Sequence, residues 1–238
     1  KAILKRRLED KVILKLIYKG QLDSILNRIG KTPLPPYIKR KTIEDKSLSD
    51  QDRERYQTVF ARHPGAIAAP TAGLHFTPHI IESLKNYSID TTYLTLHVGV
   101  GTFQPIRTEN IIEHKMQAEQ FYVPEDTSRA ILEAKKNAQN IVGIGSTTTR
   151  VLESIELNTL EFGKISGWTD RFIYPGQKFE LVDHMLTNFH LPRSSLLLLV
   201  SAFAGRKNIL DAYAEAIREG YRFYSYGDAM AVMARSSR

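Results

Sequence analysis

The feature of this sequence that most constrains its fold is the alternation of strand and helix patterns that begins near residue 65. The first helix pattern carries two start signals, Thr77 as its cap and Pro78 at its first position. Helices placed between strands predict an α/β layered domain. In chain order the patterns are a short strand at 67–69, a helix at 77–86, a strand at 89–98, a helix at 124–136, a strand at 140–144 and a helix at 146–156.

The remainder of the chain continues this order with shorter patterns. An amphipathic helix is predicted at 208–219, and short strands at 172–174, 179–181 and 222–224. The all-apolar run at 196–203 does not reveal its period. A buried strand and the start of a helix are therefore both open there.

The start of the chain has a different pattern. Two alternating stretches at 2–8 and 11–18, with a turn between them, predict a β-hairpin. Because a two-stranded hairpin is marginal in water, we expect it to be the remnant of a separate β domain. A helix pattern at 21–29 and a Pro-rich stretch follow it. The predicted parts are the remnant at 1–19, a basic linker and helix at 20–62, and the α/β layered domain at 63–238.

The composition is that of an ordinary globular protein. The 238 residues are 42% hydrophobic and 25% charged, which supplies a substantial core. The longest apolar run, at 196–205, is shorter than the roughly 20 residues that span a bilayer, and no signal-peptide pattern opens the chain. We therefore expect a cytoplasmic protein with no membrane partner. The absence of cysteine excludes thiolate nucleophiles and cysteine-ligated metals.

The net charge of +7 is concentrated at the start of the chain. Residues 1–62 contain 16 Lys and Arg against 8 Asp and Glu, whereas residues 63–238 contain 17 against 18. A basic segment of this kind can neutralise the phosphates of a nucleic acid. On charge alone, a solvated basic strand face and loop are the favoured explanation.

Two histidine-bearing motifs have the composition of a site. In TLHVGVGTFQP (95–105), Gly99 and Gly101 let a ligand approach the backbone closely, and Thr102 adds a hydroxyl group. The motif EHKMQAE (113–119) follows it and adds titratable side chains. Such side chains serve as general acids and bases. The candidates in the two motifs are His97, Glu113, His114 and Glu119.

The motif PTAGLHFT (70–77) lies between a strand pattern and a helix pattern, where the active-site loops of open α/β sheets are found. His75 in this motif is either an acid, a base or a ligand contact, or else a histidine bonded to the backbone beside Gly73. The sequence leaves both interpretations open.

The motif GSTTTR (145–150) sets hydroxyl groups at the start of a helix and Arg150 one turn inside it. Unpaired N–H groups at a helix start suit a carboxylate or a phosphate. Capping by Ser146 or Thr147 alone needs no ligand. Three consecutive threonines favour a site, and the hydroxyl candidates are Thr147, Thr148 and Thr149.

Two further loops carry polar and aromatic side chains. GWTDRFIYPG (167–176) contains Trp168, Asp170 and Tyr174, which suit the stacking of a base and hydrogen bonds with its edge. The alternative is that Trp168 packs over a sheet edge and Asp170 caps a turn. The loop before the apolar run contributes Asn188 and His190. HExxH, Walker, GxSxG and GxGxxG motifs do not occur, and we expect no metal site.

Together these motifs resemble one family closely, the S-adenosylmethionine:tRNA ribosyltransferase-isomerases of queuosine biosynthesis. The resemblance runs from about residue 1 to residue 230 and keeps the order and spacing of the family's motifs. The segment GSTTTR departs from the family's more usual GTTSVR, although its hydroxyl groups and Arg150 remain. The other matching motifs are PLPPYIKR, DRERYQTVFA, PTAGLHF, LHVGVGTFQP, EHKMQAE, GWTDRFIYPG, LLVSAFAGR and YRFYSYGDAM, together with the loop before the apolar run.

The resemblance implies both a fold and a reaction. Members of this family have an αβα layered domain and a separate β-barrel domain, of which the hairpin would be a remnant. In the implied reaction, the ribosyl part of S-adenosylmethionine moves to the aminomethyl group of 7-aminomethyl-7-deazaguanine at the tRNA wobble position and is isomerised. Adenine and methionine leave, and epoxyqueuosine is formed. The implied partner is the tRNA anticodon stem-loop, and the expected state is a monomer.

The resemblance also suggests roles for the candidates. We assign acid and base roles to His97 and His114, with Glu113 or Glu119 orienting them and His75 in support. Asp170 would accept hydrogen bonds from the deazaguanine, with Trp168 or Tyr174 stacking on it. The remaining substrate contacts are Gly99, Gly101, Thr102, Thr147, Thr148, Thr149, Arg150, Asn188 and His190, and the tRNA contacts are Lys39, Arg40 and Arg53.

Two other classes of function are compatible with the same residues. A non-catalytic RNA-binding module would use the basic front for phosphates and the aromatic side chains for bases. A small-molecule enzyme would carry its positive charge incidentally. Binding of S-adenosylmethionine separates the first class from the family reaction, and dependence on tRNA separates the second.

Overall fold

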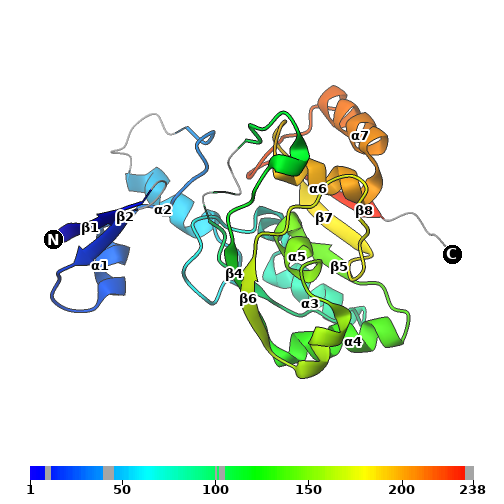
Figure 1. Ribbon diagram of the computed structural model, residues 1–238, viewed down its shortest axis with the longest axis horizontal. Helices are drawn as coiled ribbons and strands as arrows, with labels where there is room; N and C mark the ends of the chain where they lie inside the picture. The colour runs from blue at the N-terminus through cyan, green and yellow to red at the C-terminus, as the bar shows by residue number, and fades with distance from the viewer. Residues whose placement is uncertain (9–11, 40–45, 100, 102–104, 234–238) are drawn as a thin grey trace.

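A computed structural model describes residues 1–8, 12–39, 46–99, 101 and 105–233, and it divides into an arm and a body (Figure 1). The arm begins with the antiparallel strands β1 (Ala2–Arg7) and β2 (Val12–Leu16), followed by helix α1 (Leu22–Ile29). Helix α2 (Lys46–Arg55) lies between the arm and the body.

The described residues of the body form two three-stranded sheets. The first sheet is antiparallel and has the order β3 (Thr95–Leu96), β4 (Glu119–Val123), β6 (Ile165–Thr169). The second sheet has the order β5 (Val142–Ile144), β7 (His184–Asn188), β8 (Ala229–Met233). In this second sheet β5 runs parallel to β7, whereas β8 runs antiparallel to it.

Helices surround the two sheets. Figure 1 shows α6 and α7 at one end of the body and α3 and α4 at the other. The helices of the body are α3 (Pro78–Asn86), α4 (Glu125–Lys136), α5 (Gly145–Leu152), α6 (Ser195–Ala204) and α7 (Arg206–Arg218), with short 3₁₀ turns at Thr71–His75, Ile111–Glu113 and Leu157–Phe162.

Two groups of buried apolar side chains hold the body together. One group joins the first sheet to α4 and α5 and includes Val123 and Val151, both of them fully buried. The other joins the second sheet to α6 and α7 and includes Met185 and Val200. Phe203 packs against both groups, so the two halves form one continuous core. The predicted α/β class is confirmed.

The predicted helices are found close to their expected positions because their signals are local. The Thr77 side chain accepts a hydrogen bond from the Ile80 N–H at 3.2 Å, and Pro78 occupies the first turn of α3. The open question at 196–203 is decided in favour of a helix. Ser194 caps α6 by accepting from the Leu197 N–H, and Gly205 ends it at a φ of 89°.

The predicted strands differ more from the structure. The predicted strands at 67–69, 172–174, 179–181 and 222–224 are absent from the described part of the chain, and only Thr95–Leu96 pairs within 89–98. Four strands, β4, β6, β7 and β8, are found where none was predicted. The physical reason is that a strand needs a partner, and partners distant in sequence cannot be identified from one segment alone.

The hairpin in the arm is confirmed, with Ala2 opposite Leu16 and Arg7 opposite Val12. Its apolar side chains, among them Leu4, Val12 and Leu14, are about half exposed. The described residues of the arm contain two strands and no closed barrel. The division of the chain at 19 and 62 stays a prediction, and the linker touches the body where Tyr37 pairs with Ser225.

Substitution Thr77→Ala tests the cap of α3. It removes the side-chain acceptor for the Ile80 N–H, and we expect the free energy of unfolding to fall by about 1 kcal/mol. Thr77→Ser retains the acceptor and should lose less than half of that amount. Urea denaturation of the three proteins measures the difference. Equal losses in both variants would contradict a capping role.

Candidate functional site

A cavity of about 300 Å³ lies at the carboxyl ends of the parallel strands β5 and β7. Ligands of open α/β sheets bind at this edge, and their pockets range from about 300 to 1,000 Å³. Residues 145–147 follow β5 into the cavity wall, residues 188–192 end and follow β7, and residues 224–225 precede β8. The cavity is therefore built by loops that the second sheet holds in place.

The turn from β5 into α5 depends on a glycine. Gly145 has a φ of 88°, a conformation that residues with a side chain rarely adopt. The turn brings the first residues of α5, including Ser146 and Thr147, to the cavity. The unpaired N–H groups of a helix start favour an anion at this position.

A short hydrogen-bond chain crosses the cavity wall. Thr71 Oγ1 donates to Asn188 Oδ1 at 2.8 Å, which fixes the orientation of the amide. Asn188 Nδ2 lies 3.3 Å from His75 Nε2. The Asn188 side chain is buried, whereas His75 is exposed. These hydrogen bonds thus connect the buried amide of Asn188 in the cavity wall to the exposed imidazole of His75.

Asp228 is close enough to His75 for their side chains to interact electrostatically. Its carboxylate accepts from the Arg222 N–H at 2.7 Å and from Arg222 Nη2 at 3.1 Å. The backbone hydrogen bond from Arg222 is the largest cause of the lowered pKa of Asp228, and the charge of His75 contributes least. Asp228 is therefore an ionised carboxylate in the neighbourhood of the imidazole.

His190 is a neutral histidine in the cavity wall. Its Nε2 lies 2.9 Å from Thr187 Oγ1, and its backbone N–H donates to the Tyr213 hydroxyl at 2.7 Å. Burial of the ring lowers the pKa of His190 to about 4. At neutral pH the side chain can donate or accept a hydrogen bond but is a weak base.

The predicted residues of α5 divide between the cavity and the interior. Thr147 lines the cavity. Thr148 Oγ1 and Thr149 Oγ1 donate to backbone oxygens one turn earlier, those of Ile144 and Gly145. Their hydroxyl groups therefore already have partners within the helix.

Arg150 and Glu119 form a buried ion pair. Arg150 Nη2 contacts Glu119 Oε2, and both side chains are at most 5% exposed. Glu119 Oε1 also accepts from the Gly99 N–H at 2.7 Å. Burial lowers the pKa of Arg150 to about 10. Because this value is still well above neutral pH, the guanidinium remains charged. This pair joins β4, α5 and the glycine-containing segment.

His97 is not among the described residues that line the cavity, whereas its neighbour Val98 is. The His97 backbone N–H donates to the Gln120 oxygen, and a side chain at Gly65 would collide with the His97 ring. Gly101 lies beside Gln117. Thr102 lies outside the described residues.

His114 belongs to an aromatic cluster away from the cavity lining. Its ring meets Phe172 edge-on at 4.9 Å, and Phe172 contacts Tyr174 at 5.4 Å. Glu113 is exposed on a 3₁₀ turn. Trp168 is 68% exposed on β6 opposite Gln120, and Asp170 is also exposed. Glu113, Trp168 and Asp170 are thus exposed, whereas His114, Phe172 and Tyr174 are half-buried in one aromatic cluster.

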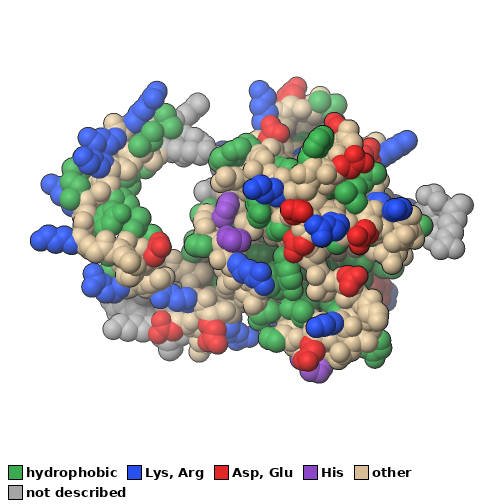
Figure 2. Space-filling model, turned by 90° about the horizontal axis from the view of Figure 1, so that it is seen from below, with side chains coloured by type: hydrophobic (Ala, Val, Ile, Leu, Met, Phe, Trp, Pro, Cys, Tyr) green, Lys and Arg blue, Asp and Glu red, His purple; other side chains and the backbone are tan. Residues whose placement is uncertain are grey.

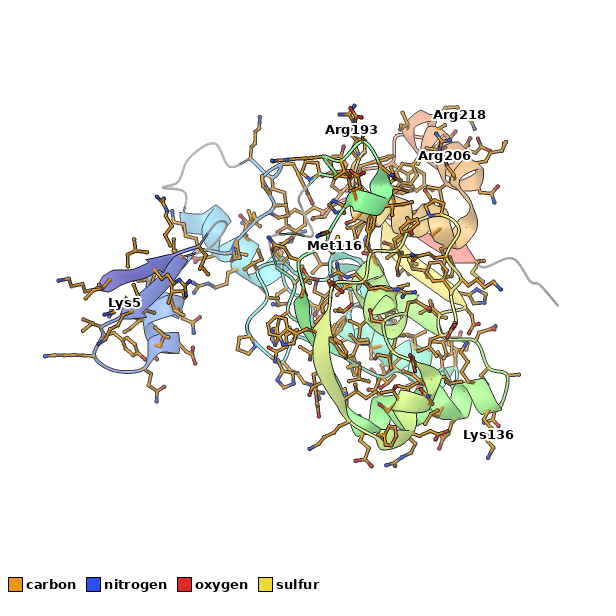
Figure 3. All side chains as sticks on the ribbon, viewed as in Figure 1. Lys5, Met116, Lys136, Arg193, Arg206 and Arg218 are labelled. Atoms are coloured by element: carbon orange, nitrogen blue, oxygen red, sulfur yellow. The ribbon has the colours of Figure 1, made fainter. Side chains whose placement is uncertain are left out.

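The basic side chains are prominent on the arm. Figure 2 shows Lys and Arg side chains along the arm, and Figure 3 shows Lys5 on the hairpin. Lys39 is exposed, whereas Arg40 lies outside the described residues. Arg53 Nη2 donates to the backbone oxygens of Asn27 and Gly30, so it also connects α2 to the end of α1.

Several residues of the cavity wall, and Asp228 next to Asn188, were not identified from the sequence. Tyr37 lies in the Pro-rich stretch, and Tyr224 and Ser225 lie in the segment before β8. Thr71 and Asp228 carry common polar side chains in motifs whose other residues gave the stronger signals. The sequence did contain one indication of their importance, because the motifs in which these five residues lie match the family pattern noted above.

The described residues contain no group of three or more His, Asp and Glu side chains arranged to hold a metal ion. Within the same residues, every helix is too short or too polar to cross a bilayer.

Comparison with known proteins identifies the family. The sequence pattern of the family described as "Queuosine biosynthesis protein" matches residues 1–232. The chain belongs to this family. The S-adenosylmethionine:tRNA ribosyltransferase-isomerase of Natranaerobius thermophilus is 50% identical over 216 residues, which cover 91% of this chain and 61% of that protein.

Other members of the queuosine biosynthesis family give the same result. The enzyme of the same name from Carboxydothermus hydrogenoformans is 48% identical over 93% of this chain and 63% of its own length. The crystal structure of a Thermotoga maritima S-adenosylmethionine tRNA ribosyltransferase superimposes with a TM-score of 0.56 and 43% identity, over 68% of this chain and 51% of that one. The chain spans less than two thirds of the length of these relatives.

Substitution Glu119→Gln tests the buried ion pair. It leaves the Arg150 charge buried without its counterion, and we expect the free energy of unfolding to fall by about 3 to 5 kcal/mol. Glu125→Gln is the control, because it breaks an exposed pair with Arg129 and should change stability by at most about 0.5 kcal/mol. Chemical denaturation compares them. Similar losses of stability in the two variants would show that the buried Glu119 pair contributes no more to the free energy of unfolding than an exposed pair does.

The pKa of His190 makes stability depend on pH. Between pH 4 and 6.5 the unfolded chain binds a proton that folded His190 does not, so the free energy of unfolding decreases as the pH falls through this range. We expect the melting temperature of His190→Gln to decrease less between pH 7 and pH 4.5 than that of the parent protein. His79→Gln, on the exposed surface of α3, is the control. Parallel pH profiles for parent and His190→Gln would refute the shift.

Proposed function

We propose that this chain carries the ribosyl transfer and isomerisation site of a tRNA-modifying enzyme of queuosine biosynthesis. S-adenosylmethionine would donate its ribosyl part to 7-aminomethyl-7-deazaguanine at the wobble position of tRNA. The products would be epoxyqueuosine-tRNA, adenine and methionine. The observation that carries the proposal is the cavity at the carboxyl ends of β5 and β7 in a member of this family.

The start of α5 suits the methionine carboxylate of S-adenosylmethionine. Its N–H groups and the Thr147 hydroxyl lie at the cavity, and a helix start stabilises negative charge. In this arrangement Arg150 acts indirectly. Its ion pair with Glu119 fixes α5 against β4, which holds the helix start at the cavity.

The chemistry requires bases and an acid. A proton must leave the ribose carbon next to the sulfonium, the substrate amine must lose a proton before it attacks, and adenine leaves more easily once protonated. His75 is the candidate with a hydrogen-bonding route to the cavity, through Asn188. His190 suits hydrogen bonding to the ribose, because its lowered pKa keeps it neutral.

The exposed candidates suit the large substrate. Trp168 and Asp170 face solvent, and His114 and Tyr174 border the same aromatic cluster. Aromatic and polar side chains on an exposed face stack and hydrogen-bond the bases of an RNA loop. We propose that these side chains, with Lys39 and the basic arm, contact the anticodon stem-loop.

The enzyme is proposed to act as a monomer. A tRNA substrate agrees with a location in the cytoplasm. S-adenosylmethionine is consumed as a substrate, and the proposed reaction needs no metal.

The proposal is tested with the full chain, S-adenosylmethionine and a tRNA that carries 7-aminomethyl-7-deazaguanine. We expect release of adenine together with a ribosyl-derived mass increase on the tRNA. His75→Ala should lower kcat by about 100- to 10,000-fold, as expected for loss of an acid or base, and leave tRNA binding nearly intact. Chromatography of adenine and mass spectrometry of the tRNA measure both products.

Three further variants identify which histidine acts as the acid or base. His97→Ala and His114→Ala test the acid and base roles predicted from the sequence, and His79→Ala, on the exposed surface of α3, is the control. A loss confined to His97→Ala or His114→Ala would move the role from His75 to that residue. Tight tRNA binding without any adenine release would overturn the enzymatic proposal in favour of a non-catalytic RNA-binding module.

A further inference from the structure

Two tyrosine rings from distant parts of the sequence meet at the cavity. Tyr37 comes from the linker and Tyr224 from the segment before β8, and both line the cavity. Their ring centroids are 5.2 Å apart, with an angle of 51° between the ring planes. The Tyr37 hydroxyl lies 2.5 Å from the hydroxyl of the buried Ser225. The two rings are thus held together at one side of the cavity.

The backbone of Tyr224 is unusual. Its φ is 72°, in a region that bulky residues almost never adopt. Its N–H donates to the Phe189 oxygen at 3.0 Å, and its own oxygen accepts from the Gly227 N–H at 3.0 Å. Strained backbone of this kind persists only where the surroundings fix it, and it is concentrated at ligand sites. The strain sets the position of the Tyr224 ring beside Tyr37.

Burial also determines the chemistry that this pair offers. It raises the pKa of the Tyr37 phenol, with the hydrogen bonds between Tyr37 and Ser225 acting in the opposite direction. The phenol is therefore protonated throughout the physiological range. The pair offers aromatic faces and a neutral hydroxyl group, which suit recognition of a planar ring better than proton abstraction.

We infer that Tyr37 and Tyr224 form the stacking wall of a binding site for a fused, purine-like heterocycle. Stacking of a base on an aromatic side chain contributes affinity with every base, because each base has a π face. The Asn188 amide and the neutral His190 ring line the same cavity and are polar groups that can meet the edge of the heterocycle or its ribose.

This inference rests on the proposed function, whose substrates contain two such rings. One is the adenine of S-adenosylmethionine, and the other is the deazaguanine of the tRNA. Both have the same stacking chemistry, so the experiment distinguishes them by their separate binding. Methionine has no ring and is the probe that the wall should not recognise.

The test compares variants of Tyr224 that keep the same backbone position. Tyr224→Phe retains the ring, whereas Tyr224→Leu removes it. Tyr224→Gly removes the ring and favours the positive φ, so it provides a folded variant if leucine disrupts the segment. Tyr37→Leu removes the other ring. Tyr87→Leu is the control, because Tyr87 is 80% exposed at the end of α3.

Isothermal titration calorimetry with S-adenosylmethionine, 5′-methylthioadenosine and methionine measures the first ring. We expect the variants that lack a ring at 37 or 224 to bind the two adenine-containing probes about 5- to 150-fold more weakly. Tyr224→Phe and Tyr87→Leu should stay within about threefold of the parent, and methionine binding should not change. A matching titration with a stem-loop RNA that carries the deazaguanine measures the second ring.

Each outcome decides a separate question. Weaker binding of the adenine probes alone assigns the wall to adenine, and weaker binding of the RNA alone assigns it to the deazaguanine. Parent-like binding of both by Tyr224→Gly and Tyr37→Leu would overturn the stacking wall and leave the proposed function standing. A parent chain that binds neither S-adenosylmethionine nor the RNA would overturn both proposals.

Discussion

The buried ion pair of Glu119 and Arg150 is the interaction on which the rest of the site depends. It crosses from the first residue of β4 to the last turn of α5, and the same carboxylate accepts the Gly99 N–H. A buried pair loses much of its stabilisation when one partner is removed, because the remaining charge stays in the interior. The pair therefore fixes three separate segments relative to one another, and α5 carries its helix start to the cavity.

The second sheet supplies what the ion pair does not. Parallel pairing of β5 and β7 brings the loops that follow them to one edge, and antiparallel β8 brings the segment before it to the same edge. Thr71, Asn188 and Tyr224 meet there from three parts of the sequence. Polar groups that must face a ligand lie on loops, while the strands and the apolar core keep those loops in register.

The accuracy of the sequence-based predictions followed the range of the interactions concerned. The helix at 78–86 was predicted closely because its cap and its proline act within one turn. β4 was missed because its first residue is a buried glutamate, which looks like an exposed polar residue until its arginine partner is known. The ion pair of Arg150 with Glu119 joins residues 31 positions apart and was not predicted from the sequence. The substrate roles of the candidates stay predictions.

The sequence alone determined the α/β class, the helices, the hairpin and the motifs of the family, because each depends on side chains close together along the chain. It also pointed to Thr147, Asn188 and His190, which the cavity brings together. Only the tertiary structure decided that His75 reaches Asn188, that Val98 rather than His97 lines the cavity and that Tyr37 meets Tyr224. These relations join residues far apart in sequence, and strand pairing and core packing, not local propensity, bring such residues together.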